Sequence, residues 1–278
     1  MPMRGRSDGT LVPGLHPLRR IMPFIMPSRT ECFVLFEQSV PVVPIRTYLA
    51  TVNAQRPATE AVTLFHVILY GLGRVFHQFP RLNRFVMGSR LYARDGIWLA
   101  FSGKKRLDLD APLFTAKLRF DPAESLTALV DRIHVTLREG RSERPTIAER
   151  EARVFLHTPT GVLRWGTRVL RRLDAWNLLP RAFIANDPLY ASTFVANLGS
   201  VGLDAAFHHN YEYGTIPIFV AVGRTHQAPV VAADGTVVAH EIVTLRYTYD
   251  ERVEDGFYAA RALESLQAYL ADPAAITR

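Results

Sequence analysis

The residues best suited to chemistry form a polar run, Asp250-Glu251-Arg252-Val253-Glu254-Asp255-Gly256, between a strand-like and a helix-like segment. The strand-like segment alternates apolar and polar residues, so successive side chains point to opposite faces of a sheet. This alternation places Glu251 on the apolar face, together with Val243, Leu245, Tyr247 and Tyr249. A carboxylate there can accept or hold a proton. Asp255 followed by Gly256 is typical of a helix N-terminus, with Asp255 as the N-cap.

A second polar cluster contains His208 and His209, in the stretch AAFHHNYEYG. Histidine can act as a general base near neutral pH. Adjacent residues of a strand point to opposite faces, so at most one of the two could serve a given site. The alternative, a loop pair that makes ordinary hydrogen bonds, is the one we expect. No further ligands at suitable spacing accompany the pair, so no metal site is predicted.

Hydrophobic periodicity predicts the elements that must position these residues. Strands and helices follow each other without strict βαβ alternation, which favours an α+β single domain over residues 19–278. A flexible arm, rich in Pro and Gly, is predicted over residues 1–18. The predicted elements are a buried strand over 31–40, a helix within 59–80 capped by Thr59, short strands around the turn at 94–96, a helix over 123–141, a third helical region over 158–180, strands near 192–199, 216–223 and 242–251, and a closing helix over 256–273.

Composition narrows the function classes. The chain has 278 residues, 48% of them hydrophobic, so it can build a core. A single cysteine, Cys32, excludes an intrachain disulfide, and its apolar surroundings predict an inert thiol. The chain starts without an apolar signal region and contains no run of 18 apolar residues. These features predict a cytoplasmic protein without stable membrane insertion.

The net charge of +7 comes almost entirely from arginine. No nucleic-acid-binding signature accompanies this charge, so nucleic acid is not an expected partner. The third helical region combines Trp165 and Trp176 with several arginines between Arg164 and Arg172. Such a helix can lie on a membrane surface. The alternative, which we expect, is that its apolar face packs on its own domain and its arginines are solvated. His66 and His77, in the helix within 59–80, are expected to pack or cap.

The run DERVEDGFYAARALESLQAYLADP resembles the C-terminal signature of the dihydrolipoamide acyltransferase core of 2-oxo acid dehydrogenase complexes, shared by chloramphenicol acetyltransferase. That signature reads H-x-x-x-D-G and is followed by a helix. Three further stretches resemble the family in the same order, so the resemblance covers residues 19–273. They are LRRIMPFIMPSR, LFHVILYGLGRVFHQFPRLNRFV, and STFVANLGSVGL followed by IPIFVAVGRTHQAPVV.

The resemblance implies a two-layer α+β, mixed-sheet, chloramphenicol-acetyltransferase-like domain that forms homotrimers or larger assemblies of trimers. It implies an active site in a channel at the subunit boundary, which admits CoA or acyl-CoA from one side and the acyl acceptor or donor from the other. The motif His of the family is a general base, and a hydroxyl before Asn-Leu-Gly stabilises the oxyanion. The motif Asp, here Asp255, forms a structural ion pair with an early arginine, for which Arg19, Arg20 and Arg29 are candidates.

This sequence departs from the family pattern at two positions. Glu251 replaces the motif His, and Ala196 replaces the oxyanion hydroxyl. Proton transfer from a thiol to an ordinary carboxylate is uphill by about 6 kcal/mol, against about 3 kcal/mol for an imidazole. Loss of an oxyanion donor typically costs a further ~10²–10³ in rate. Asn197 or Ser200 could replace the lost hydroxyl.

These departures leave two predictions of function. The first is a stand-alone, CoA-dependent acyltransferase without a lipoyl domain, in which Glu251 is the base or a positioning group and one of the paired histidines is a possible replacement base. The second is a non-catalytic trimeric protein that binds acyl-CoA or serves as a scaffold. Candidate contacts with CoA are Ser200, Lys104 and Lys105; a solvated turn explains the two lysines equally well. The acyl acceptor is not predicted.

Overall fold

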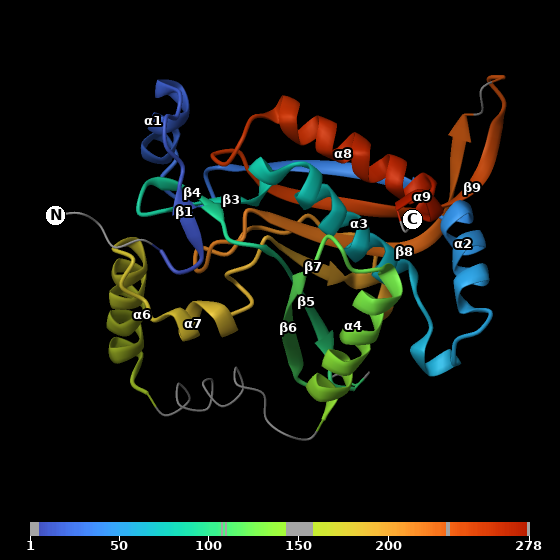
Figure 1. Cartoon of the computed structure of the whole chain (residues 1–278), viewed down its shortest axis with the longest axis horizontal. Helices are drawn as coiled ribbons and strands as arrows, with labels where there is room; N and C mark the ends of the chain where they lie inside the picture. The colour runs from blue at the N-terminus through green and yellow to red at the C-terminus, as the bar shows by residue number, and fades with distance from the viewer. Residues whose placement is uncertain (1–5, 107, 109, 143–157, 232–233, 277–278) are drawn as a thin grey trace.

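Six strands of this computed structural model form one mixed sheet in the order β2-β9-β8-β7-β5-β6 (Figure 1). Strands β5, β7 and β8 run parallel to one another, and the remaining neighbours pair antiparallel. The structure describes residues 6–106, 108, 110–142, 158–231 and 234–276. The six strands are β2 (Phe33–Pro41), β9 (Val237–Asp250), β8 (Ile218–Val231), β7 (Thr193–Asn197), β5 (Ile97–Lys104) and β6 (Leu113–Phe120).

A smaller antiparallel sheet, in the order β1-β4-β3, lies near the start of the chain. Its strands are β1 (Gly9–Leu11), β4 (Arg90–Arg94) and β3 (Arg84–Met87). A Cβ atom at Gly9 would lie 2.6 Å from the carbonyl oxygen of Ala93, so only glycine permits this close pairing. The structure therefore differs from the flexible arm predicted for residues 1–18. Residues 9–11 are a paired strand, and such pairing depends on a distant partner that a three-residue pattern does not reveal.

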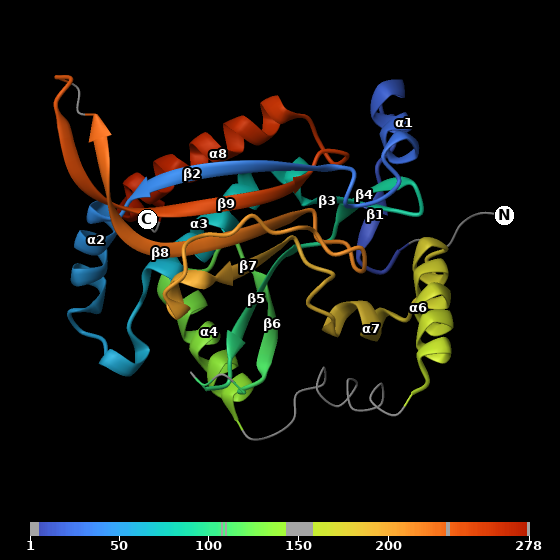
Figure 2. The ribbon, with the colours of Figure 1, turned by 180° about the vertical axis from the view of Figure 1, so that it is seen from behind.

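Helices cover one face of the large sheet, and most of the other face carries irregular chain. Figure 1 shows α3, α4 and α8 over the first face, with α2 and α9 beside them. Figure 2 shows the opposite face, where the segment 202–217 crosses the strands β8 and β9. The helical segments are α1 (Pro17–Ile25), α2 (Val43–Asn53), η1 (Ala58–Glu60), α3 (Leu64–Gln78), η2 (Pro80–Asn83), α4 (Leu126–Arg141), α6 (Thr160–Ala175), α7 (Arg181–Asn186), η3 (Leu198–Val201), α8 (Gly256–Ala271) and α9 (Pro273–Ile276).

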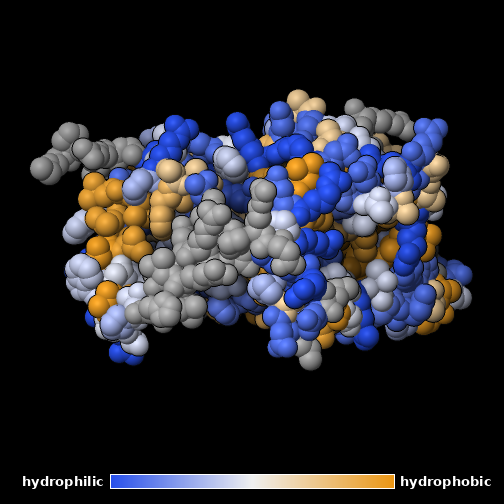
Figure 3. All heavy atoms as spheres, turned by 90° about the horizontal axis from the view of Figure 1, so that it is seen from below, coloured by the Kyte–Doolittle hydropathy of each residue, from blue (hydrophilic) through white to orange (hydrophobic). Residues whose placement is uncertain are grey.

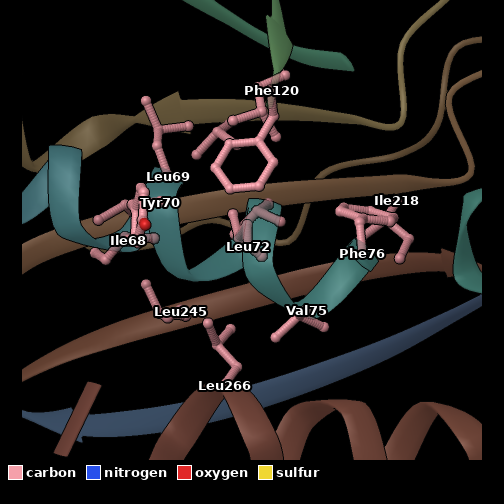
Figure 4. Packing of buried hydrophobic residues seen from close by; sticks show 14 of the residues in the cluster. Ile68, Leu69, Tyr70, Leu72, Val75, Phe76, Phe120, Ile218, Leu245 and Leu266 are labelled. Carbon is pink, nitrogen blue, oxygen red and sulfur yellow. The ribbon is translucent and has the colours of Figure 1, made fainter. Parts of the chain in front are cut away.

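The main core lies between the helices and the sheet. Figure 4 shows Leu72 and Phe76 of α3 beside Ile218 of β8, with Leu245 of β9 and Leu266 of α8 below them. All of these side chains are buried, and each such burial stabilises the fold by about 1.5–3 kcal/mol. The predicted alternation is confirmed for the second half of β9, because the four apolar side chains predicted to share a face all belong to this core: Val243, Leu245, Tyr247 and Tyr249.

Two predicted elements differ from the structure in detail. The first large helix begins at Leu64 with Thr63, not Thr59, as its N-cap. The Thr63 hydroxyl accepts a hydrogen bond from the backbone N–H of His66, and the His66 ring accepts one from Thr63, so His66 is a capping residue. Strand β2 exists as predicted, but it is an edge strand with alternate residues exposed rather than a buried one. Within the described part of the chain, no helix is both long and apolar enough to cross a membrane.

Candidate active site

The polar run after β9 forms a tight turn that leads into α8. Strand β9 ends at Asp250, and the backbone N–H of Glu251 donates to the carbonyl of Cys32 at 3.0 Å. Asp255 caps α8, because its Oδ1 accepts a hydrogen bond from the N–H of Tyr258 at 2.9 Å. The prediction of Asp255 as N-cap is therefore confirmed. Hydrogen bonds therefore hold both ends of the turn. Glu251 is bonded to Cys32, just before β2, and Asp255 is bonded to the first turn of α8.

A buried ion pair brackets Glu251. Arg252 donates to Asp250 twice, from Nε to Oδ1 at 2.9 Å and from Nη2 to Oδ2 at 2.8 Å. The Asp250 and Arg252 side chains are 1% and 3% exposed. Burial alone would raise the pKa of Asp250, but the hydrogen bonds and charge of Arg252, with the charge of Arg29, hold it below its ordinary value. Asp250 is therefore a carboxylate, and the pair holds the backbone on both sides of Glu251.

The segment before β2 closes over this ion pair. Arg252 Nη1 donates to the carbonyl of Met26 at 3.0 Å, and Arg29 Nη1 donates to that of Ile216 at 2.6 Å. Arg29 is fully buried, which lowers its pKa. Burial has the opposite effect on an acidic group and raises the pKa of the Cys32 thiol. The thiol therefore stays protonated, as expected of an inert core cysteine. These contacts join the turn after β9 to the segment 202–217.

Arg19 of α1 holds the other side of the turn. Its Nη1 donates to the carbonyl of Glu251 at 2.9 Å, and its Nη2 lies 3.5 Å from Glu254 and 3.9 Å from Asp255. Among the three candidate arginines, Arg19 is the one that reaches Asp255. Glu254 is buried and also pairs with Arg84, at 2.8 Å. A cavity of about 520 Å³ opens beside this cluster, under α1.

The side chain of Glu251 contrasts with everything around it. It is partly exposed, and its carboxylate makes no hydrogen bond or ion pair with any residue that the structure describes. Its backbone N–H and C=O are both held, by Cys32 and Arg19. The turn therefore fixes the backbone of Glu251 and leaves its carboxylate available.

The residues of the Asn-Leu-Gly stretch form a second, separate turn at the end of β7. Asn197 Oδ1 accepts from the backbone N–H of Ser200 at 3.2 Å, and the Ser200 hydroxyl donates to the Asn197 carbonyl at 2.7 Å. The Ser200 proton is thus used within the turn. The Asn197 amide nitrogen has no partner among the described residues and remains a free donor. A Cβ atom at Gly199 would lie 2.5 Å from the carbonyl oxygen of Gly223, so this turn depends on glycine to approach β8.

Within one chain the two turns lie at opposite ends of the strands, because β7 runs parallel to β8 and β9 runs antiparallel to it. Asn197 pairs with Val222 of β8, which pairs with Leu245 of β9. Glu251 follows Leu245 by six residues, which is about 20 Å along the strand. Ala196, level with Arg246, is nearly as far from Glu251. A single chain therefore does not bring Glu251 together with Asn197 or Ser200.

The histidine pair lies between the two turns, on the face that the 202–217 segment crosses. His208 stacks on Phe219 with ring centroids 4.0 Å apart, and on His209 at 4.8 Å. Its Nδ1 faces the His209 carbonyl at 2.7 Å, so Nδ1 carries the proton and Nε2 is the basic nitrogen. Burial lowers the pKa of His208, which keeps the ring neutral near pH 7. The expected loop pair with ordinary hydrogen bonds is present, and Thr248 anchors it through the His208 carbonyl.

The two predicted CoA-contacting lysines lie at the same end of the sheet as Asn197, because β5 runs parallel to β7. Lys104 ends β5, and its Nζ donates to the carbonyl of Asp108; Lys105 Nζ donates to that of Ser142 at 3.3 Å. Both ammonium groups thus stabilise neighbouring turns. No group of three or more His, Cys, Asp or Glu residues suited to a metal ion occurs in the described ranges.

The sequence interpretation missed the Asp250–Arg252 pair and the arginines around Glu254. The first left a signal, because Asp250 and Arg252 are two residues apart and carry opposite charges. The second left none, since Arg84 pairs with Glu254 from 170 positions away.

Residues 186–278 match the family model of the 2-oxoacid dehydrogenases acyltransferase (catalytic domain). No curated protein sequence matches the chain.

Solved structures share the fold across most of the chain. The dihydrolipoamide acetyltransferase of Azotobacter vinelandii has 17% identity and a TM-score of 0.62, over 95% of this chain and 93% of that one. The cubic core of a pyruvate dehydrogenase multienzyme complex has 17% identity and a TM-score of 0.61, over 88% and 83%. A chloramphenicol acetyltransferase has 12% identity and a TM-score of 0.57, over 91% and 94%. The predicted resemblance and the predicted α+β, mixed-sheet fold are confirmed, and trimer formation stays a prediction.

Proposed function

We propose that this chain is a CoA-dependent, acyltransferase-like protein with an altered active site, which a second copy in a trimer completes. The observation that carries the proposal is the turn after β9. Asp250, Arg252, Arg19 and Asp255 hold its backbone, and the Glu251 carboxylate is left without a partner among the described residues. A purely structural role for this turn does not require an unpaired carboxylate on a firmly held backbone.

The proposed base and the proposed oxyanion donor lie at opposite ends of the sheet. Glu251 accepts or positions the proton of a thiol or hydroxyl nucleophile, and the free amide of Asn197 donates to the developing oxyanion. Since about 20 Å separates these groups in one chain, the end of the sheet that carries Asn197 in one copy must meet the end that carries Glu251 in another. A serine, a histidine and an asparagine were studied for roles in the mechanism of the Azotobacter acetyltransferase. Here Ala196 and Glu251 occupy the positions predicted for the hydroxyl and the histidine.

His208 is the second candidate base. Its pKa is lowered by burial, its Nδ1–H is held by a carbonyl, and its Nε2 is free of partners among the described residues. A neutral imidazole with a fixed tautomer is better matched to a thiol than a carboxylate is. Substitution of Glu251 and substitution of His208 therefore distinguish the two candidate bases.

The test combines binding with turnover. Acetyl-CoA binding is measured by calorimetry, and acetyl transfer is measured with a dithiol, dihydrolipoamide, and with hydroxyl acceptors. Glu251→Gln should retain binding and lose at least tenfold in transfer, whereas Glu251→His should raise transfer by up to about a hundredfold. His208→Gln is the parallel variant for the second base. Transfer that survives both Gln substitutions unchanged would remove both residues from the mechanism.

A non-catalytic acyl-CoA-binding protein is the second candidate function. It is favoured by Ala196, which offers no hydroxyl, and by the Ser200 hydroxyl, which is already donated to Asn197. This candidate expects acetyl-CoA binding with no transfer above background to any acceptor. Both candidate functions assume a trimer, and sedimentation analysis tests this assumption. A chain that stays monomeric at concentrations where acetyl-CoA binds cannot assemble a site from two copies.

A further inference from the structure

Helix α6 is attached to the domain by only part of its surface. Figure 1 shows it at one end of the molecule, beyond the small sheet. Asp174 is its only buried residue, held by Arg6 at 2.7 Å and by the hydroxyl of Tyr190 at 2.7 Å. Leu170 and Leu173 pack against the small cluster beneath the helix. This attachment orients α6 but covers only one side of it.

An apolar stripe on α6 remains uncovered. Val162, Trp165 and Trp176 are 54%, 68% and 63% exposed. With Val169 they fall within an arc of about 60° on the helix. Figure 3, which views the molecule from below, shows apolar side chains gathered at its left end, where Figure 1 places α6. The expected packing of the whole apolar face on the domain is therefore wrong for this stripe.

The arc next to the stripe carries only positive charge. Its members are Arg164, Arg168, Arg171 and Arg172, all exposed. Within the described ranges none of these four guanidinium groups forms an ion pair. The helix has one acidic residue, Asp174, and Arg6 already neutralises it. The exposed surface of α6 thus combines tryptophan with unpaired arginine.

We propose that α6 docks the protein on an anionic lipid surface, lying parallel to it with Trp165 and Trp176 in the headgroup region. Tryptophan prefers this region because its ring is apolar and its N–H is polar. The flanking guanidinium groups are positively charged and complement the negatively charged phosphates and carboxylates of lipids. Nucleic acid would satisfy the arginines but leave the apolar stripe exposed, whereas a second copy would cover the stripe and leave four cations without counter-charges. This inference does not depend on the proposed acyl transfer.

The test is co-sedimentation of the full chain with vesicles of phosphatidylcholine alone or mixed with phosphatidylserine. The wild type should bind the mixed vesicles and not the neutral ones, and added salt should release it. The variant R168Q/R171Q/R172Q should bind about a hundredfold more weakly, at about fivefold per arginine. The matched control R138Q/R224Q/R261Q removes the same three charges from α4, β8 and α8, and should bind as the wild type does.

Tryptophan fluorescence reports the depth of contact. Brominated phosphatidylcholine in the mixed vesicles should quench the wild type, but not W165S/W176S, which keeps only Trp98. Absence of binding to mixed vesicles, or equal losses in the arginine variant and its control, would overturn the proposal. So would tighter binding to RNA or DNA than to mixed vesicles. If W165S/W176S instead dissociates an oligomer of a wild type that ignores vesicles, α6 is an interface between copies and the proposal fails. Circular dichroism confirms that each variant is folded.

Discussion

Removal of the Asp250 charge should be among the most damaging single changes in this protein. Asp250→Asn keeps the size of the side chain but removes the buried carboxylate that faces Arg252 and Arg29. Breaking a buried ion pair by removing one partner costs about 3–5 kcal/mol. Single domains have a total stability of about 5–15 kcal/mol, so the loss is a large share of it. We therefore expect the melting temperature to fall by about 10 °C.

A double-mutant cycle separates the pair from its surroundings. Urea unfolding followed by circular dichroism gives the stability of the wild type, Asp250→Asn, Arg252→Met and the double variant. The double variant should be less destabilised than the sum of the singles by at least about 2 kcal/mol, because Arg252 is no longer buried without Asp250 and only Arg29 still loses that charge. A coupling below about 0.5 kcal/mol, or a loss below about 1 kcal/mol for Asp250→Asn, would refute the role given to this pair.

The same pair predicts a pH dependence. The pKa of Asp250 in the folded state lies below its ordinary value because Arg252 and Arg29 outweigh the cost of burial. Its contribution to stability is therefore present above the unfolded pKa, about 3.9, and is lost as pH falls through the folded pKa. Asp250→Asn should lack this part of the acid-dependent loss.

Three further predictions concern capping and close packing. Burial, with His134 and Arg56 nearby, lowers the pKa of His66 to about 4. The free energy of unfolding should therefore fall by about 3 kcal/mol as pH drops from about 6.5 to 4, because the unfolded chain takes up the proton first. Urea titrations of His66→Gln should lack this loss, and an equal loss would contradict the assignment. Asp255→Ala should cost about 1 kcal/mol by removing the α8 cap; Asp255→Asn, which can still cap, should cost less, and equal losses in urea would instead point to the contact with Arg19. Gly199→Ala should cost about 1–3 kcal/mol, since its Cβ would lie 2.5 Å from a carbonyl oxygen of β8; a melting temperature equal to that of the wild type would show that the turn can shift away.

Local patterns predicted the elements whose contacts are close in sequence. The alternation along β9 depends on neighbours two residues apart, and the start of α8 depends on a hydrogen bond over three residues, from Tyr258 to Asp255. Where two local signals competed, the prediction was less accurate. Thr59 and Thr63 are both good capping residues, but the helix begins after Thr63, where the His66 ring completes the capping hydrogen bonds.

Elements whose state depends on a distant partner were predicted incorrectly or incompletely. Residues 9–11 form a strand because β4 supplies the opposite edge, and β2 is half exposed because it pairs only with β9. The apolar stripe of α6 has ordinary helical spacing in the sequence. Its exposure results from the anchoring of Asp174 by Arg6, 168 residues away, which turns the stripe from the domain.

The sequence by itself determined that Val243, Leu245, Tyr247 and Tyr249 share one strand face and that Asp255 starts the last helix, because both follow from the geometry of a few consecutive residues. Only the tertiary structure decided that the Glu251 carboxylate is free while its neighbours Asp250 and Arg252 are buried and paired. It also decided that Asn197 and Glu251 lie at opposite ends of the strands. Strand order and direction are set by packing between residues far apart in the chain, and no local pattern carries that information.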